Sequence, residues 1–147
     1  MYGKVNVSSK EKDYEFCFNI HKSLKKEDRQ IEPEFYSKWM ESNHTHYDFE
    51  IISIDGKSDL LDGFHIHESK LNGKKFVCWS GQLPTEMHAM TTVNTWCVGT
   101  VYTLETGIDF QKLYDIHGLS MDEFCAMDSV LRDSYGVTAI NTLYSFK

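Results

Sequence analysis

Apolar and polar residues alternate along several stretches of the chain, and this period of two predicts β-strands. Two of these stretches flank Asn72-Gly73, the dipeptide most typical of a two-residue hairpin turn. A long run rich in β-branched and aromatic residues predicts a further strand, with a bend or bulge near Gly99. The predicted strands cover residues 2–7, 47–54, 63–71, 74–80, 91–104 and 137–146.

Other stretches repeat apolar residues every three or four positions, which predicts amphipathic helices in two pairs. Two of these helices follow a capping box, in which a serine and a glutamate three residues later bond the first backbone N–H groups. The predicted helices follow Ser8–Glu11, begin at Glu32-Pro33, cover 108–117 and run from Ser120 to Tyr135. The stripe of the first helix would consist of Tyr14, Cys17, Phe18, His21 and Leu24. The segments 25–30, 42–45 and 81–89 are predicted loops.

This order of elements, β-α-α-β-β-β-β-α-α-β, predicts the fold class. Consecutive strands in the middle of the chain favour a mainly antiparallel sheet, and helix pairs at both ends would pack on one of its faces. The chain has 147 residues, close to the commonest domain size. We therefore expect a single α+β domain over residues 1–147, built as a two-layer sandwich.

Composition narrows the classes of partner. The formal net charge is −7, which disfavours extended contact with a nucleic-acid backbone. No segment has the length and apolarity of a membrane span, so no membrane partner is expected. The four cysteines form no Cys-x-x-Cys pair, which favours free thiols and a cytoplasmic location.

The predicted hairpin carries the candidate chemistry. If Asn72-Gly73 is a two-residue turn, His67 lies opposite Cys78 and His65 lies opposite Ser80. One face of the hairpin would then be apolar and face the core, with Phe64, Ile66, Val77 and Trp79. The other face would consist of His65, His67, Ser69, Leu71, Phe76, Cys78 and Ser80. It would therefore present two imidazoles, a thiol and two hydroxyls.

Three interpretations of this polar face stay open at the level of sequence. His65, His67 and Cys78 form a plausible zinc site with one open coordination position, and no other cofactor is indicated. Alternatively, His65, His67 and Ser69, joined by His44, serve metal-free acid–base catalysis or hold an anion. In the third interpretation the histidines face solvent without a chemical role.

Two functions follow from these alternatives. The first is a non-catalytic binder or inhibitor that sequesters a macromolecular or nucleotide-like partner, favoured by acidic charge, 14% aromatic residues and the lack of a catalytic signature. The alternative is a small enzyme acting on a nucleotide or phosphate ester through the histidine face, with or without a metal. The expected partner is thus a protein or a small anionic ligand, and the sequence leaves the oligomeric state open.

Overall fold

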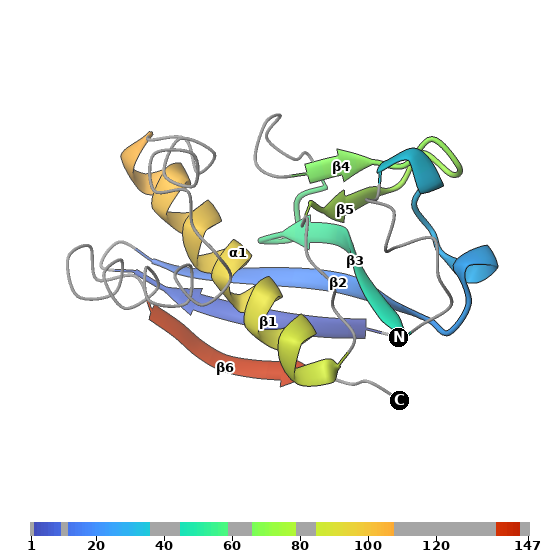
Figure 1. Ribbon diagram of the computed structural model, residues 1–147. Helices are drawn as coiled ribbons and strands as arrows, with labels where there is room; N and C mark the ends of the chain where they lie inside the picture. Colours follow the sequence, from blue (N-terminus) through green and yellow to red (C-terminus); the bar gives the residue numbers. More distant parts are fainter. Residues whose placement is uncertain are drawn as a thin grey trace, which may run out of the picture.

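The described part of the chain forms one antiparallel sheet with an α-helix against one face (Figure 1). The computed structural model describes residues 2–9, 12–35, 45–58, 66–78, 85–107 and 138–144. The elements are β1 (Tyr2–Ser8), β2 (Asp13–Ser23), β3 (His46–Ile54), β4 (Ile66–Glu68), β5 (Lys75–Val77), α1 (Glu86–Thr106) and β6 (Thr138–Tyr144). Across the sheet the strands lie in the order β4-β5-β3-β2-β1-β6.

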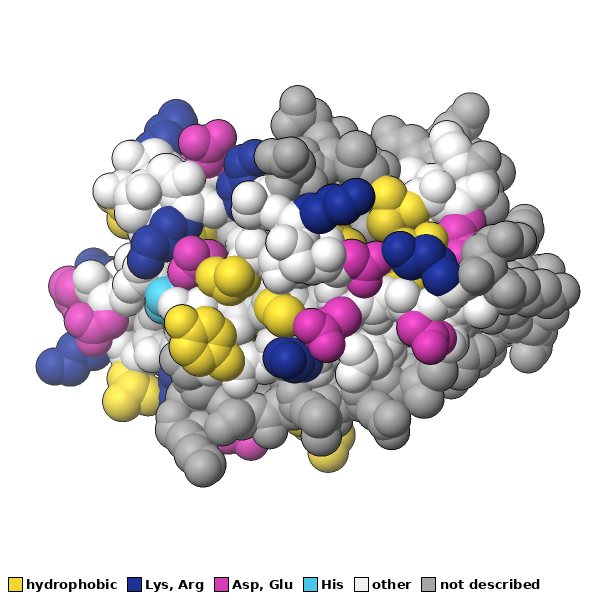
Figure 2. All heavy atoms as spheres, turned by 180° about the vertical axis from the view of Figure 1, so that it is seen from behind, with side chains coloured by type: hydrophobic (Ala, Val, Ile, Leu, Met, Phe, Trp, Pro, Cys, Tyr) yellow, Lys and Arg dark blue, Asp and Glu magenta, His cyan; other side chains and the backbone are white. Residues whose placement is uncertain are grey.

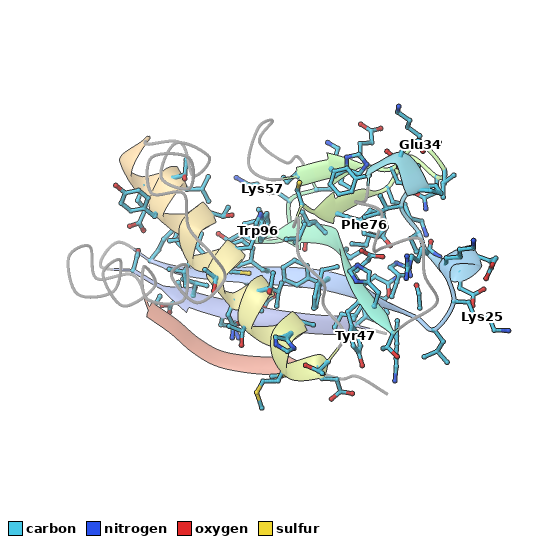
Figure 3. The ribbon with its side chains drawn as sticks, viewed as in Figure 1. Lys25, Glu34, Tyr47, Lys57, Phe76 and Trp96 are labelled. Carbon is cyan, nitrogen blue, oxygen red and sulfur yellow. The ribbon has the colours of Figure 1, made fainter. Side chains whose placement is uncertain are left out.

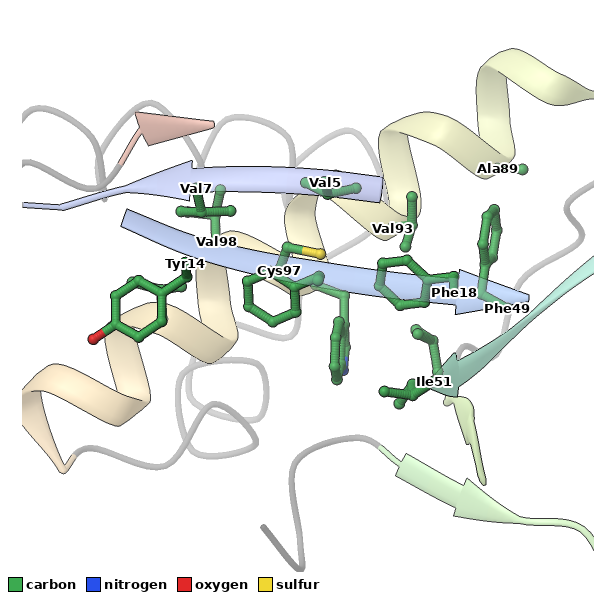
Figure 4. Packing of buried hydrophobic residues seen from close by; sticks show 14 of the residues in the cluster. Val5, Val7, Tyr14, Phe18, Phe49, Ile51, Ala89, Val93, Cys97 and Val98 are labelled. Carbon is green, nitrogen blue, oxygen red and sulfur yellow. The ribbon is translucent and has the colours of Figure 1, made fainter. Parts of the chain in front are cut away.

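The core lies between α1 and the sheet (Figure 4). Alternate residues of the long strand β2 are buried on this side, namely Tyr14, Phe16, Phe18 and Ile20. Trp96 of α1 is fully buried, and its ring meets those of Phe16 and Phe18 edge-on at centroid distances of 5.8 and 6.0 Å. These aromatic contacts fix how α1 lies across the sheet, because edge-to-face pairs are favourable only in a narrow range of geometries.

Several predictions from the alternating pattern are confirmed. The structure has strands within the predicted segments 2–7, 47–54 and 137–146, and the segments around Asn72-Gly73 form an antiparallel hairpin. All strand pairs of the described sheet are antiparallel. The apolar face of the hairpin is also confirmed where it is described, since Ile66 and Val77 pack into the core.

The first predicted helix is wrong, because residues 13–23 form β2. The apolar residues of this segment fit two patterns. One is a helical stripe, and the other is an alternating set of four large side chains that suits a strand. The strand buries all four against α1, whereas the helical stripe would have left Phe16 and Ile20 outside it. Ser8 of the predicted capping box ends β1, and its hydroxyl donates to the Asp13 side chain at the start of β2.

The predicted strand over 91–104 is also wrong, as is the predicted loop over its described residues 86–89, because both belong to α1. Thr85 caps the helix by accepting the His88 backbone N–H, and Gly107 ends it at a φ of 76°. Three threonine hydroxyls bond carbonyls four residues earlier, namely Thr95 to Thr91, Thr100 to Trp96 and Thr103 to Gly99. Burial of α1 against the sheet outweighs the strand preference of its β-branched residues, which is weak and depends on context.

The structure does not support the predicted helix pairs. The segment after Glu32-Pro33 shows only a 3₁₀ turn, Pro33–Phe35, within the described residues, and a second such turn, Lys26–Asp28, lies in the predicted loop 25–30. The predicted helices at 108–117 and 120–135 lie outside the described residues. Within the described ranges α1 is the one α-helix, so the α+β class and the antiparallel sheet stand without the pairs.

Candidate functional site

The hairpin forms with a longer loop than the Asn-Gly pair predicts. Ser69 and Lys74 close the loop, with the Ser69 N–H donating to the Lys74 carbonyl at 2.8 Å. The strand register follows, with Ile66 opposite Val77 and His67 opposite Phe76. A type I′ turn needs positive φ at both central residues, but of the pair only Gly73 has it, at 71°. His67 therefore lies opposite Phe76 and not opposite Cys78, although a shift by two residues keeps His67 and Phe76 on the predicted face.

A segment that we call the strap, residues 29–35, covers this face of the hairpin (Figure 3, where Glu34 marks the strap and Phe76 the hairpin). The strap connects the end of β2 toward β3, and its residues Arg29, Ile31 and Glu32 are buried. Phe35 stacks on the His67 ring at a centroid distance of 3.8 Å. The histidine face of the hairpin is therefore packed against another part of the chain.

Glu32 makes the central contact of the strap. Only 4% of its surface is exposed, and its Oε1 lies 2.6 Å from His67 Nε2. The Lys70 backbone N–H donates to the other oxygen, Oε2, at 2.9 Å. Burial opposes the charge, but the hydrogen bonds from backbone N–H groups and from His67 outweigh it and hold the pKa of Glu32 below its ordinary value. Glu32 is therefore an anion, and since a carboxylate can only accept, His67 Nε2 carries the shared hydrogen.

Ser69, the predicted hydroxyl of the site, has a different partner. Its side chain is buried and donates to the Gln30 carbonyl of the strap at 2.7 Å. The Asn72 amide donates to the same carbonyl at 3.0 Å. The loop of the hairpin thus holds the backbone of the strap at Gln30 while His67 and Lys70 hold its carboxylate.

Two further histidine–carboxylate pairs lie on the same sheet face. His21 Nε2 is 2.9 Å from Glu50 Oε1, and His46 Nε2 is 3.1 Å from Asp48 Oδ1. The sequence predicts neither pair, because His21 falls on a predicted helical stripe and His46 lies just before the predicted strand 47–54. A retrospective signal exists for His46, because His46 and Asp48 share a face once residue 46 belongs to a strand.

His46 and His67 lie on the same sheet face but far apart. The register places His46 and His67 roughly 16 Å apart, from a rise of ~3.3 Å per residue along β3 and ~4.8 Å per strand. One small ligand cannot contact both. His44 and His65 lie outside the described residues, so their part in a site stays a prediction.

The zinc hypothesis likewise stays a prediction. In the described ranges no three His, Cys, Asp or Glu side chains are grouped to hold a metal, but the proposed ligand His65 lies outside those ranges. Burial raises the pKa of the Cys78 thiol in the absence of a metal. His67 already uses Nε2 on Glu32.

The other half of the same sheet face has no such cover among the described residues. We call it the open face; it consists of Tyr2, Lys4, Asn6, Glu15, Cys17, Asn19 and Ile52. A bulge opposite Cys17 places Ile52 on this side, so that Ile51 and Ile54 both stay with the core. Tyr2 is 71% exposed and Ile52 37%. Figure 2 views the molecule from this side and shows acidic and basic side chains intermixed with hydrophobic ones.

Comparisons with protein families, with curated proteins and with solved structures found no match to this chain. Among the described residues, no helix has the length and apolarity needed to cross a membrane. The function of the chain must therefore be inferred from the geometry of the strap, the hairpin and the open face.

Proposed function

We propose that the chain is a non-catalytic binding protein that sequesters a protein partner on its open face. The observation that carries the proposal is the state of the two described candidate catalytic residues. His67 is bonded to Glu32 and stacked on Phe35, and Ser69 is buried and bonded to the strap backbone. Both side chains hold the strap to the hairpin, and among the described residues the open face is a broad surface without such a cover.

The open face carries side chains that can contribute to a protein interface. Tyr2 is an exposed aromatic residue, the type of side chain that most often anchors an interface. Lys4 and Glu15, with Nζ and Oε1 3.8 Å apart, add charges of both signs that can set the register of a partner. The net charge of −7 favours a partner with a basic surface, through faster association at low salt.

The test compares wild-type protein with a Tyr2→Ala/Ile52→Ser double variant as bait for proteins of the source cell. Met87→Ala is the matched control, because Met87 is 78% exposed but lies on α1, on the opposite side of the sheet. We expect a partner that the wild type and Met87→Ala retain and the double variant loses, with an affinity for purified partner reduced at least about tenfold. A partner held equally by all three proteins would refute the open face as the binding surface.

One observation favours the alternative, a small enzyme acting on a phosphate ester or nucleotide. A buried carboxylate that orients an imidazole at 2.6 Å is the arrangement that positions a histidine general base. A panel of nucleotides and phosphate esters assayed with wild type and His67→Gln separates the two functions. Turnover lost in His67→Gln with an intact fold supports the enzyme, whereas partner binding unchanged in His67→Gln supports the binder.

A further inference from the structure

The strap packs on the hairpin and places the Glu32 carboxylate against its hydrogen-bond donors. The hairpin contributes a donor to each oxygen of the Glu32 carboxylate, His67 Nε2 at 2.6 Å and the Lys70 N–H at 2.9 Å. Separate donors to both oxygens recognise a carboxylate by shape as well as charge. We propose that the hairpin is a carboxylate-binding site that Glu32 fills in cis, and that an acidic segment of a partner protein competes with the strap for it. This inference is independent of the open face.

The local charges match such a ligand. The hairpin carries Lys70, Lys74 and Lys75 within six residues, while Glu68 lies opposite Lys75 and Glu50 Oε1 lies 3.8 Å from Lys74 Nζ. The tip therefore keeps a small positive charge, although the chain as a whole has a net charge of −7. The strap includes two glutamates, Glu32 and Glu34, and one basic residue, Arg29, so its formal charge is negative. Since the basic tip is local, it attracts an acidic segment at short range despite the acidic chain around it.

The strap also indicates what else the ligand needs. Phe35 stacks on the His67 ring, and Nε2 of the same ring bonds Glu32. His67 therefore contacts both a carboxylate and the aromatic ring that follows it by three positions in the strap. Ser69 and Asn72 bind the Gln30 carbonyl, a backbone group that any peptide provides. The preferred ligand is therefore an acidic segment with the pattern Glu-x-x-Phe or its equivalent.

The first experiment removes the Glu32 carboxylate and tests whether acetate binds in its place. In Glu32→Ala, sodium acetate is titrated while the NMR signals of the His67 ring and the Lys70 amide are followed. We expect saturable shifts at millimolar acetate, at least about tenfold weaker in wild type and in the matched control Glu34→Ala, where Glu32 still fills the site. Shifts that are absent, or that do not saturate in Glu32→Ala, would overturn the proposal.

A second experiment does not depend on how well Glu32→Ala folds. The isosteric variant Glu32→Gln is titrated with a synthetic peptide of residues 29–35 and with the same peptide carrying glutamine in place of its first glutamate. We expect the glutamate peptide to bind at least about tenfold more tightly, and more tightly to Glu32→Gln than to wild type, where the attached strap competes at high effective concentration. Equal affinity for the two peptides would show that the hairpin does not select a carboxylate. The proposed function would not fail with it. It would still be supported if the Tyr2→Ala/Ile52→Ser variant loses its partner.

Discussion

The two halves of the sheet face opposite α1 both carry polar side chains, but they differ in their surroundings. On the strap-covered half, Glu32, His67 and Ser69 are held by hydrogen bonds of 2.6 to 2.9 Å. On the open face, Lys4 and Glu15 are about half exposed, at 54% and 49%, and their charged atoms lie 3.8 Å apart. Polar groups removed from water need partners with good geometry, whereas polar groups in water do not. Polar side chains on a sheet face therefore indicate a functional site only once it is known whether another segment of the chain packs on them.

The largest expected difference between the halves comes from truncating a ring beneath the strap. Phe76 is fully buried at the centre of the covered half, opposite His67 and Glu50. We expect Phe76→Ala to lower the free energy of unfolding by about 3–5 kcal/mol, since a cavity is added to the lost transfer energy. Urea denaturation measures it, and Tyr2→Ala, a truncation of an exposed ring, should stay within about 0.5 kcal/mol. Similar losses in both variants would remove the distinction between the halves.

The next effect in size comes from the strap carboxylate. Glu32→Gln keeps the shape of the side chain but removes the charge that His67 and the Lys70 N–H hold. We expect a loss of about 1–3 kcal/mol in the free energy of unfolding, because a charged acceptor with two donors is replaced by a poorer one. Glu34→Gln on the exposed side of the same turn is the control and should change stability by less than about 0.5 kcal/mol.

The stabilisation by Glu32 should also depend on pH in a defined direction. The folded state lowers the pKa of Glu32 below its ordinary value of 4.5, so the charged form favours folding. Its contribution is fully present above pH 4.5 and is lost as the pH falls through the folded pKa. Urea midpoints of wild type and Glu32→Gln, measured from about pH 7 to about pH 3, should converge in acid. A difference between the two proteins that grows in acid would contradict this sign.

The smallest effect is expected for the ion pair of the open face. Lys4→Ala and Glu15→Ala each remove one partner of an exposed pair, which typically contributes less than about 1 kcal/mol and is screened by salt. A double-mutant cycle should give a coupling of at most about 0.5 kcal/mol. A larger coupling would show that this half is organised as tightly as the covered one.

Part of the site was predictable from the sequence. The alternation around Asn72-Gly73 places His67, Ser69 and Phe76 on one face of a hairpin, and a shift of two residues in register keeps that assignment because side chains alternate with a period of two. The partner of His67 was not predictable. Glu32 is 35 positions away, in a segment predicted to begin a helix, and only packing brings it to the hairpin.

The sequence alone predicted strands β1, β3 and β6 and the antiparallel hairpin between β3 and β6. Tertiary structure decided the segments whose local signals conflict. Residues 13–23 fit both a strand and a helix, and the threonine-rich segment 91–104 favours a strand by propensity but forms α1. Local preferences amount to a few tenths of a kcal/mol per residue, whereas burying a large side chain such as Trp96 or Phe16 contributes about 1.5–3 kcal/mol. The arrangement that buried these rings against each other therefore prevailed.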